Sequence, residues 1–428
     1  MKPVFQLKVI LQRFKQKFNK TNKRGYTMAR FLKFFILFAS FFTYQSITFS
    51  QTADELNKQA MDLFLHGKMQ EAIDKLHEAL KKDSTHVSAH INLGYIHYFN
   101  GKNDEAIAEY KKALHFDPQN ALAHNYLANA YFAVNNYKES IKEYQQAIKY
   151  NPKYPQAYNN LAYCLFTIGL YDLAIKEAQK AIELNPKYAT AYVNLGQAYH
   201  AKGMYDEAET QFKKALEIDS TLVIAHNNLG VTYRVKGMLD EAIKEHLKCI
   251  ELDSLNAQSY NNLGLCYFEK GETDKAIQVF NKALQIAPNY AIVHNNIAYA
   301  YYDALNYSMA MQHAKAAERL GIKVNEEFMD NLIKALDPQY MRARHILVKT
   351  QAEAEQILAQ LKRGASFKKL AESKSLDQAT ASRGGDFGYF KKGDLRPEFE
   401  RIIASLKVGE ISKVIKTDLG YHIFQRLN

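Results

Sequence analysis

Apolar residues recur at spacings of three and four along most of the chain, the pattern of an amphipathic helix. The segment 191–220 contains two such stretches, and Gly203 interrupts the pattern between them. The residues of the two apolar faces are Tyr192, Leu195, Ala198 and Tyr199, then Ala208, Phe212, Ala215 and Leu216. We therefore predict two helices joined by a tight turn, with "EIDS" ending the second helix.

The same segment recurs with a period of 34 residues. Small residues mark three positions of the period, of which the clearest is Ala72, Ala106, Ser140, Ala174, Ala208, Ala242, Ala276 and Ala310. Eight units span residues 53–324, and the helical pattern of 325–336 is that of a closing helix. The period and its small-residue positions resemble the tetratricopeptide repeat family. One unit cannot bury its apolar face alone, so stacking predicts an all-α helical-repeat solenoid over residues 51–324, capped by 325–336.

An asparagine recurs on the first helix of the repeats. It stands one residue before a Leu or Ile, and Tyr126 interrupts the series, whose members are Asn92, Asn160, Asn194, Asn228, Asn262 and Asn296. The ladder is similar to one in the array of the O-linked N-acetylglucosamine transferase, which implies a concave groove that holds an extended peptide by its backbone. An amide offers a donor and an acceptor, as a peptide unit does. The alternative is that these residues only pack the helices. The candidate groove residues are Asn160, Asn194, Asn228, Asn262 and Asn296.

Two other residue types in the array predict packing and no chemistry. Histidine alternates with tyrosine at one repeat position, as in His226 and Tyr260, which is not how a metal ligand behaves. The three cysteines, Cys164, Cys249 and Cys266, lack CxxC spacing and occupy small-residue positions, so we interpret them as buried apolar side chains. A disulfide between Cys249 and Cys266 is the alternative.

The 34-residue period ends before Arg342, after a short linker at 337–341. "HILVK" predicts a strand, and residues 352–375 predict two helices broken near Gly364. "GGDFGYF" predicts a glycine-rich turn into a strand, and "PEFERIIASL" a helix with Pro397 in its first turn. "EISKVIKT" and "GYHIFQRL" predict strands on either side of a turn at Asp418–Gly420. Residues 342–428 are therefore expected to form a small α+β domain.

This domain resembles the parvulin family of peptidyl-prolyl cis/trans isomerases. The matching segments, in order, are "HILVK", "FKKLAE", "GGDFGYF", "PEFE", "LKVGEIS" and "GYHIF". The resemblance implies that the strands bearing His345 and His422 are central neighbours. It further implies a polar site of His345, Asp377, His422 and Thr417 and an apolar wall for the proline ring made by Phe387, Leu395 and Phe399. No basic insertion follows the first strand, so a requirement for substrate phosphate is not expected.

The chemistry needs neither a nucleophile nor a metal. Rotation about an X–Pro bond faces a barrier of about 18–20 kcal/mol, and no bond has to break. We therefore expect no cofactor and no metal. We expect a folding factor whose array binds extended client proteins with X–Pro bonds, or a partner protein. The alternative is a non-catalytic scaffold, in which the repeats dock a protein complex and the parvulin-like unit only binds peptide.

Charge is concentrated at the amino terminus. Residues 1–50 carry ten of the 56 Lys and Arg residues and no Asp or Glu, which leaves 46 basic and 45 acidic residues after them. The nearly neutral remainder predicts no nucleic-acid partner. From Met28, a candidate start, a short basic stretch precedes an apolar run and "TFSQ", which predicts a secretory signal cleaved before Gln51. The alternative is an uncleaved membrane anchor. Either predicts an exported protein of the periplasm or cell envelope.

Overall fold

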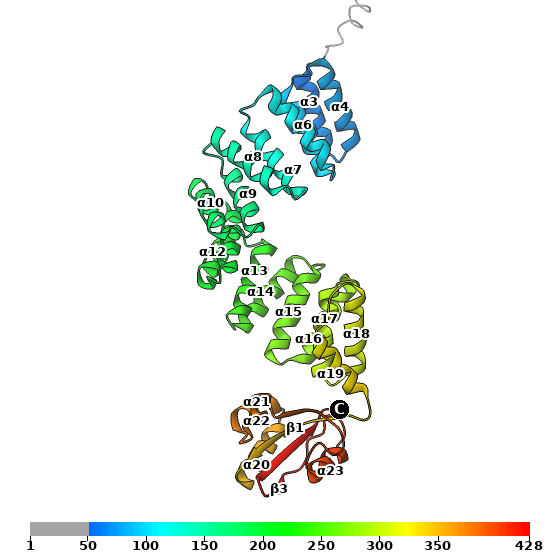
Figure 1. The fold of residues 1–428 in the computed structure, drawn as a ribbon. Coiled ribbons are helices and arrows are strands. Elements are labelled where there is room, and N and C mark those ends of the chain that lie inside the picture. Colours follow the sequence, from blue (N-terminus) through cyan, green and yellow to red (C-terminus); the bar gives the residue numbers. More distant parts are fainter. Residues whose placement is uncertain (1–50) are drawn as a thin grey trace, which may run out of the picture. The chain divides into compact units, whose positions relative to one another are not determined.

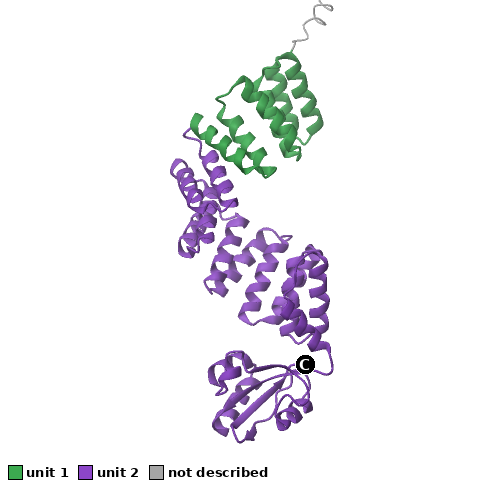
Figure 2. Ribbon diagram, viewed as in Figure 1, with its two compact units in different colours: residues 1–150 green, residues 151–428 purple. Residues whose placement is uncertain are grey.

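The computed structural model describes residues 51–428, and the predicted targeting segment lies outside them. The described residues form two compact units, residues 51–150 and 151–428 (Figure 2). Within the part that is described, no helix combines the length and the apolar character that a membrane crossing requires.

The first unit consists of helix pairs, as the periodic pattern predicts. Consecutive helices pack as antiparallel partners across tight turns (Figure 1). The helices are α3 (Ala53–Leu65), α4 (Met69–Lys82), α5 (Val87–Phe99), α6 (Asn103–Phe116), α7 (Ala121–Ala133) and α8 (Tyr137–Tyr150).

The second unit continues with five more helix pairs and a closing helix. The pairs are α9 (Pro155–Thr167) with α10 (Tyr171–Leu184), α11 (Ala189–Ala201) with α12 (Tyr205–Ile218), α13 (Val223–Val235) with α14 (Leu239–Leu252), α15 (Ala257–Lys270) with α16 (Thr273–Ile286), and α17 (Ala291–Asp303) with α18 (Tyr307–Arg319). Helix α19 (Glu326–Leu336) packs on α18, and Asn325 caps its first turn. The helical-repeat solenoid is confirmed.

Small residues recur because a large ring lies against them. A Cβ atom built on Gly196 of α11 would lie 2.6 Å from the ring of Phe212 on α12. Gly264 and Phe280 repeat this contact two units later. Both rings are fully buried, so each of these two helix pairs closes over one aromatic side chain.

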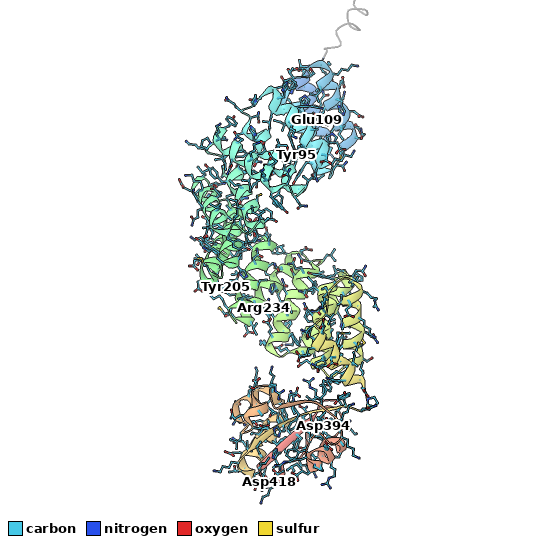
Figure 3. The ribbon with its side chains drawn as sticks, viewed as in Figure 1. Tyr95, Glu109, Tyr205, Arg234, Asp394 and Asp418 are labelled. Atoms are coloured by element: carbon cyan, nitrogen blue, oxygen red, sulfur yellow. The ribbon has the colours of Figure 1, made fainter. Side chains whose placement is uncertain are left out.

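The array histidines fill a hydrogen-bonded position between paired helices. His226 Nδ1 lies 2.6 Å from Glu245, and its Nε2 lies 3.1 Å from the carbonyl oxygen of Ser220. His90 has the same contacts to Ser84 and to Glu109, which Figure 3 labels. For His226, two acceptors require two N–H donors, so its geometry fits an imidazolium. The hydrogen bond to Glu245 raises the pKa of His226 against the opposing effect of burial. Its stabilisation is therefore full below about pH 6.5 and is lost as pH rises through the raised pKa.

The carboxyl-terminal domain is an α+β fold around a four-stranded antiparallel sheet of order β2-β1-β4-β3. Its strands are β1 (Met341–Val348), β2 (Asp386–Phe390), β3 (Ile415–Thr417) and β4 (Gly420–Arg426). Its helices are α20 (Gln351–Lys362), α21 (Phe367–Lys374), α22 (Gln378–Ala381) and α23 (Pro397–Ser405). The predicted fold class is confirmed, including the adjacent central strands β1 and β4.

Two local predictions are wrong. "EISKVIKT" does not form one strand, because Ser412 interrupts it. The Ser412 hydroxyl oxygen accepts a hydrogen bond from the Phe424 N–H at 2.9 Å, where a ladder would use a backbone carbonyl. Strand β3 therefore keeps only Ile415–Thr417, with an isolated bridge at Ile411. The short helix α22 was not predicted; Asp377 caps it by accepting from the Ala379 N–H.

His246 is an exception in the array core. It occupies the position that Phe212 and Phe280 fill in neighbouring repeats, and its side chain is fully buried. Neither ring nitrogen has a hydrogen-bond partner. Burial, with a smaller contribution from Arg234, lowers the pKa of His246 to about 4. A buried imidazole without partners should destabilise the array.

We expect His246→Phe to stabilise the protein, because a phenyl ring fits this position and has no polar atom to desolvate. The gain should be about 1–3 kcal/mol in the free energy of unfolding, measured by urea denaturation at pH 8. The lowered pKa adds a second signature. Stability linked to His246 is complete above about pH 6.5 and falls as pH approaches 4, so the advantage of Phe should grow on acidification.

The matched control is the reverse change, Phe212→His, at the equivalent position of the preceding repeat. It should lower stability and introduce the same acid sensitivity. If His246→Phe is neutral or destabilising both at pH 8 and after acidification, the claim that the buried imidazole lacks a hydrogen-bond partner is wrong.

Candidate active site

Four polar side chains form one hydrogen-bonded chain across the sheet. Asp377 Oδ2 lies 2.7 Å from His345 Nε2, and His345 Nδ1 lies 3.1 Å from His422 Nδ1. His422 Nε2 lies 3.0 Å from the hydroxyl oxygen of Thr417. His345 and His422 come from adjacent strands β1 and β4, where Leu347 is the Cα partner of His422. The structure thus brings together the four polar residues that the sequence singled out.

The hydrogen-bonded series Asp377–His345–His422–Thr417 has one consistent arrangement of protons with both imidazoles neutral. The Nδ1 atoms of His345 and His422 face each other and can share only one proton. If His345 donates from Nε2 to the Asp377 carboxylate, its Nδ1 must accept from His422. His422 Nε2 then accepts from the Thr417 hydroxyl, whose oxygen itself accepts from the Leu419 N–H at 3.1 Å.

Burial favours this neutral state. His345 and His422 are 3% and 0% exposed. Burial lowers the pKa of His345, although the hydrogen bond to Asp377 opposes the shift. Burial and then the neighbouring His345 lower the pKa of His422 to about 4. Both rings are therefore uncharged near neutral pH.

Asp377 stays ionised through hydrogen bonds that outweigh its burial. Burial alone would raise its pKa, but bonds from Thr380 and His345 hold the pKa below its ordinary value. The Thr380 hydroxyl donates to Oδ2 at 2.6 Å, and about a quarter of the Asp377 side chain remains exposed. Sequence reasoning missed Thr380, because the short helix α22 that places it three residues after Asp377 was not predicted.

The three predicted apolar residues also come together. Phe399 of α23 is buried in a cluster with Phe424, and Phe387 and Leu395 pack against that cluster. The cluster adjoins the polar chain, because the Phe387 ring centroid lies 4.5 Å from His345 and that of Phe399 lies 5.0 Å from His422. The structure places an apolar wall beside a buried polar chain.

Two further residues hold this wall in place, and sequence reasoning missed one of them. Buried Glu400 accepts hydrogen bonds from the backbone N–H groups of Gly393 and Leu395, at 2.8 and 3.0 Å, and so fixes the loop that carries Leu395. The glycine-rich turn lets β1 approach closely. A Cβ on Gly385 would lie 2.0 Å from the carbonyl oxygen of His345, and the φ angle of Gly385 is +82°.

The asparagine ladder makes contacts between repeats. The Nδ2 atoms of Asn194, Asn262 and Asn296 donate at 2.8–2.9 Å to an asparagine of the preceding repeat, namely Asn159, Asn227 and Asn261. Asn228 Nδ2 is buried without a partner, because the corresponding acceptor position holds Val193. Asn92 donates to Asn57 in the same way, and the side chain of Asn160 is half-buried. Each of these paired amides therefore uses one side-chain N–H for contact between repeats. In Asn194 and Asn296, the side-chain oxygen and the second N–H remain available to a ligand.

Cysteine and metal chemistry find no support in the described residues. Cys164, Cys249 and Cys266 are all free thiols and buried. Burial raises the pKa of Cys249 to about 11, which disfavours the reactive thiolate. Across residues 51–428, no three His, Cys, Asp or Glu side chains gather as a metal site.

The last repeat docks on the domain through the other face of the sheet. The hydroxyl oxygens of Tyr302 and Tyr389 lie 2.9 Å apart, and the Arg342 guanidinium lies over both rings at 5.1 and 5.2 Å. Arg342 Nε donates to Asp386 at 2.9 Å, and the Tyr307 hydroxyl donates to the Leu427 carbonyl. Because side chains alternate along β1, Arg342 and His345 face opposite sides of the sheet. The histidine side is the one turned away from this contact.

Family models match both parts of the chain. A PPIC-type PPIASE domain matches residues 341–428, and tetratricopeptide repeat models match 96–135, 128–169, 153–221, 223–254 and 257–290. The protein consists of tetratricopeptide repeats followed by a parvulin-type peptidyl-prolyl isomerase domain.

Two curated relatives each match about a quarter of this chain. The foldase protein PrsA of Geobacillus kaustophilus (strain HTA426) is 44% identical over 104 residues, which is 24% of this chain and 37% of that protein. A parvulin-like PPIase of Rickettsia typhi (strain ATCC VR-144 / Wilmington) is 45% identical over 104 residues, 24% of this chain and 36% of that protein. The chain thus spans little more than a third of the length of these relatives.

The repeats are similar to a solved structure at the level of fold. The crystal structure of the APC/C hetero-tetramer Cut9-Hcn1 gives a TM-score of 0.51 at 20% identity, covering 68% of this chain and 58% of that chain. At this identity the likeness describes architecture alone.

The proton arrangement makes a direct spectroscopic prediction. In ¹⁵N-edited NMR spectra, His422 should show protonated Nδ1 and unprotonated Nε2 at pH 7. Its titration midpoint should lie near pH 4, because burial lowers its pKa to about that value. Thr417→Val removes the Thr417 donor and should change the Nε2 shift, while Thr210→Val on α12 serves as a control for hydroxyl removal elsewhere. A titration midpoint of His422 near pH 6.5 would contradict the lowered pKa of this buried imidazole.

Proposed function

We propose that this protein is a peptidyl-prolyl cis/trans isomerase of the folding-factor type, whose repeat array binds the client or partner polypeptide. One observation carries the proposal: two buried, neutral imidazoles link Asp377 to Thr417 beside the wall of Phe387, Leu395 and Phe399. This arrangement pairs an apolar surface for a proline ring with oriented polar groups for the amide. No group in it needs a cofactor.

The wall and the polar chain have different tasks. The apolar side chains grip the ring and exclude water from the rotating bond. A carbonyl with few hydrogen-bond donors near it loses less when C–N resonance is broken, so the barrier to the twisted amide is lowered. Asp377 and Thr417, at the partly exposed ends of the chain, set the local field and hydrogen bonding around that amide.

The two histidines act through their neighbours. Because they are 3% and 0% exposed, their imidazoles hold Asp377 and Thr417 at a fixed separation and do not meet the substrate themselves. His345 and His422 are thus positioning residues in this proposal. Strand β1 ends at Val348 and α20 begins at Gln351, which leaves no room for a phosphate-binding insertion there and supports activity without substrate phosphate.

In this proposal, the array binds the same client polypeptide whose X–Pro bonds the domain isomerises. The half-buried amides of the asparagine ladder would hold an extended segment, and tethering raises the concentration of its X–Pro bonds near the domain. The histidine side of the sheet faces away from the last repeat. We therefore expect the isomerised bond to lie in a segment separate from the one that the last repeats hold.

Export is the second part of the proposal. It rests on the basic, apolar start of the chain and its "TFSQ" segment. The mature protein should begin at Gln51 and reside in the periplasm or cell envelope. N-terminal sequencing of protein purified from the native envelope checks this; an intact residue 28–50 segment would instead indicate an anchor.

The activity prediction uses two substitutions that leave the core in place. In a protease-free assay of a tetrapeptide with one X–Pro bond, Asp377→Ala should lower kcat/KM on the order of 10²-fold, because it removes a preorganised polar group. Leu395→Ala should lower it about tenfold by removing part of the ring wall. Leu395 is preferable to Phe399, which is buried and whose loss would also destabilise the fold.

A matched control is Asp394→Ala, an exposed carboxylate one residue before Leu395 (Figure 3), which should leave kcat/KM unchanged. Chelator-treated buffer and an unphosphorylated peptide should support full activity. If the folded wild-type protein binds several X–Pro peptides but isomerises none, the scaffold alternative is correct and the catalytic proposal fails.

The groove prediction separates client contact from packing. Replacing Asn194, Asn228 and Asn262 together with Ala should weaken binding of an unfolded client, measured by calorimetry. Each lost hydrogen bond contributes about 0.5–1.5 kcal/mol. The control triple variant replaces Asn159, Asn227 and Asn261, which removes the inter-repeat bonds of Asn194, Asn262 and Asn296. It should alter the melting temperature but leave affinity unchanged. Equal affinity losses in the two variants would assign the ladder to packing.

A further inference from the structure

A cavity of about 830 Å³ lies between the last two repeats and the carboxyl-terminal domain. Its repeat side is formed by the ends of α15 and α17 and the turns that follow them, and its domain side by β1, α20 and α21. Phe268, Leu305 and Phe367 contribute apolar surface. The cavity contains Arg342 and Arg344, so it lies on the sheet face opposite His345 and is separate from the active site.

Arg344 is the distinctive group of this cavity. Its Nε donates to Gln425 Oε1 at 2.7 Å, and its guanidinium lies 4.9 Å from the ring centroid of Phe367. Among the described residues, no carboxylate lies within ion-pair distance of it. Burial lowers the pKa of Arg344, with partial compensation from Asp303 and Asp386. A half-buried guanidinium fixed through Nε and stacked on a ring presents its two terminal NH₂ groups in one orientation.

The other charges around the cavity leave a positive excess. Arg342 is paired with Asp386, and Glu269 is paired with Arg234 from outside the cavity. Asp303 accepts a hydrogen bond from Thr273. Lys270 is paired with Asp240 at 2.6 Å. The other basic side chains at the rim are Lys368, Lys369 and Arg383, all exposed, and Glu372 lies 4.0 Å from Lys368.

We propose that this cavity binds an acidic segment of a polypeptide, with a carboxylate on the terminal NH₂ groups of Arg344 and flanking acidic side chains near Lys369 and Arg383. Arginine's planar fork matches a carboxylate in bidentate geometry. The volume lies in the range of roughly 300–1,000 Å³ that holds small ligands or a few residues. The apolar walls accommodate side chains between the acidic ones. Since repeats and domain both line the cavity, an occupant would join them and fix the orientation of the isomerase.

The test uses N-acetyl-hexaglutamate amide and the full chain from Gln51 in calorimetric titrations at low ionic strength. The peptide should bind wild type, and hexaglutamine of the same length should not. Arg344→Met keeps the aliphatic stem against Phe367 and should weaken binding at least tenfold. The double variant Lys369→Glu/Arg383→Glu changes only exposed side chains and should weaken it similarly, which keeps the test valid even if Arg344→Met misfolds. Exposed charges at the rim also predict weaker binding at high salt.

Arg401→Gln is the matched control, because Arg401 is exposed and lies on α23, the helix whose Phe399 packs beside His422. It should bind the peptide as wild type does. Equal binding by wild type and the double variant would overturn the proposal, as would failure of the peptide to bind. Inorganic phosphate is the competing ligand. If it binds the same residues as tightly as hexaglutamate does, the cavity is a general anion site and the peptide assignment is wrong.

Discussion

The contact between two buried imidazoles, His345 and His422, is the constraint on which the carboxyl-terminal domain depends. Their Nδ1 atoms lie 3.1 Å apart on adjacent central strands, where two charged rings would repel each other in a poorly solvated interior. Neutral rings share one proton between their Nδ1 atoms, so His345 Nε2 needs an acceptor and His422 Nε2 needs a donor. Asp377 and Thr417 meet that need, which ties α22, β1, β4 and β3 into one arrangement. The polar site and the sheet register therefore support each other.

A second constraint, close helix approach, organises the array. Gly196 against Phe212 shows how one small residue and one ring close a helix pair. His246 shows what a polar ring does in the same position, where it keeps the volume and loses the hydrogen bonds. Asn228 is a similar case, because Val193 replaces the partner that other repeats supply. Comparing equivalent positions of the repeats thus identifies the side chains, His246 and Asn228, that lack the contacts made in other repeats.

Much of this was predictable from the sequence because periodicity is a local signal. The helix pairs follow from apolar spacing, and the domain resemblance correctly places His345 beside His422. Other features depend on contacts that no local pattern encodes. Ser412 breaks a predicted strand by bonding Phe424, which is 12 residues away. Neither Thr380, which bonds Asp377, nor Glu400, which holds the loop before α23, stands out in the sequence.

The junction between repeats and domain was also invisible in the sequence. Arg342 follows the predicted linker and marks the change of pattern, but nothing local pairs it with Tyr302 and Tyr389. The junction has a functional consequence, because it uses the sheet face opposite the histidines. Under the proposed function, a client held by the array would therefore have to extend around the sheet to reach the histidine side.

Proline-limited refolding of an unfolded protein, compared with isomerisation of a short peptide, tests the coupling of array and site most directly. We predict that disrupting Tyr302 and Tyr389 at the junction slows catalysed refolding and leaves peptide isomerisation intact. Asp377→Ala should slow both. If the junction variant refolds the client as fast as wild type does, the array does not deliver clients to the site. If neither reaction is catalysed by the folded protein, the isomerase assignment itself is contradicted.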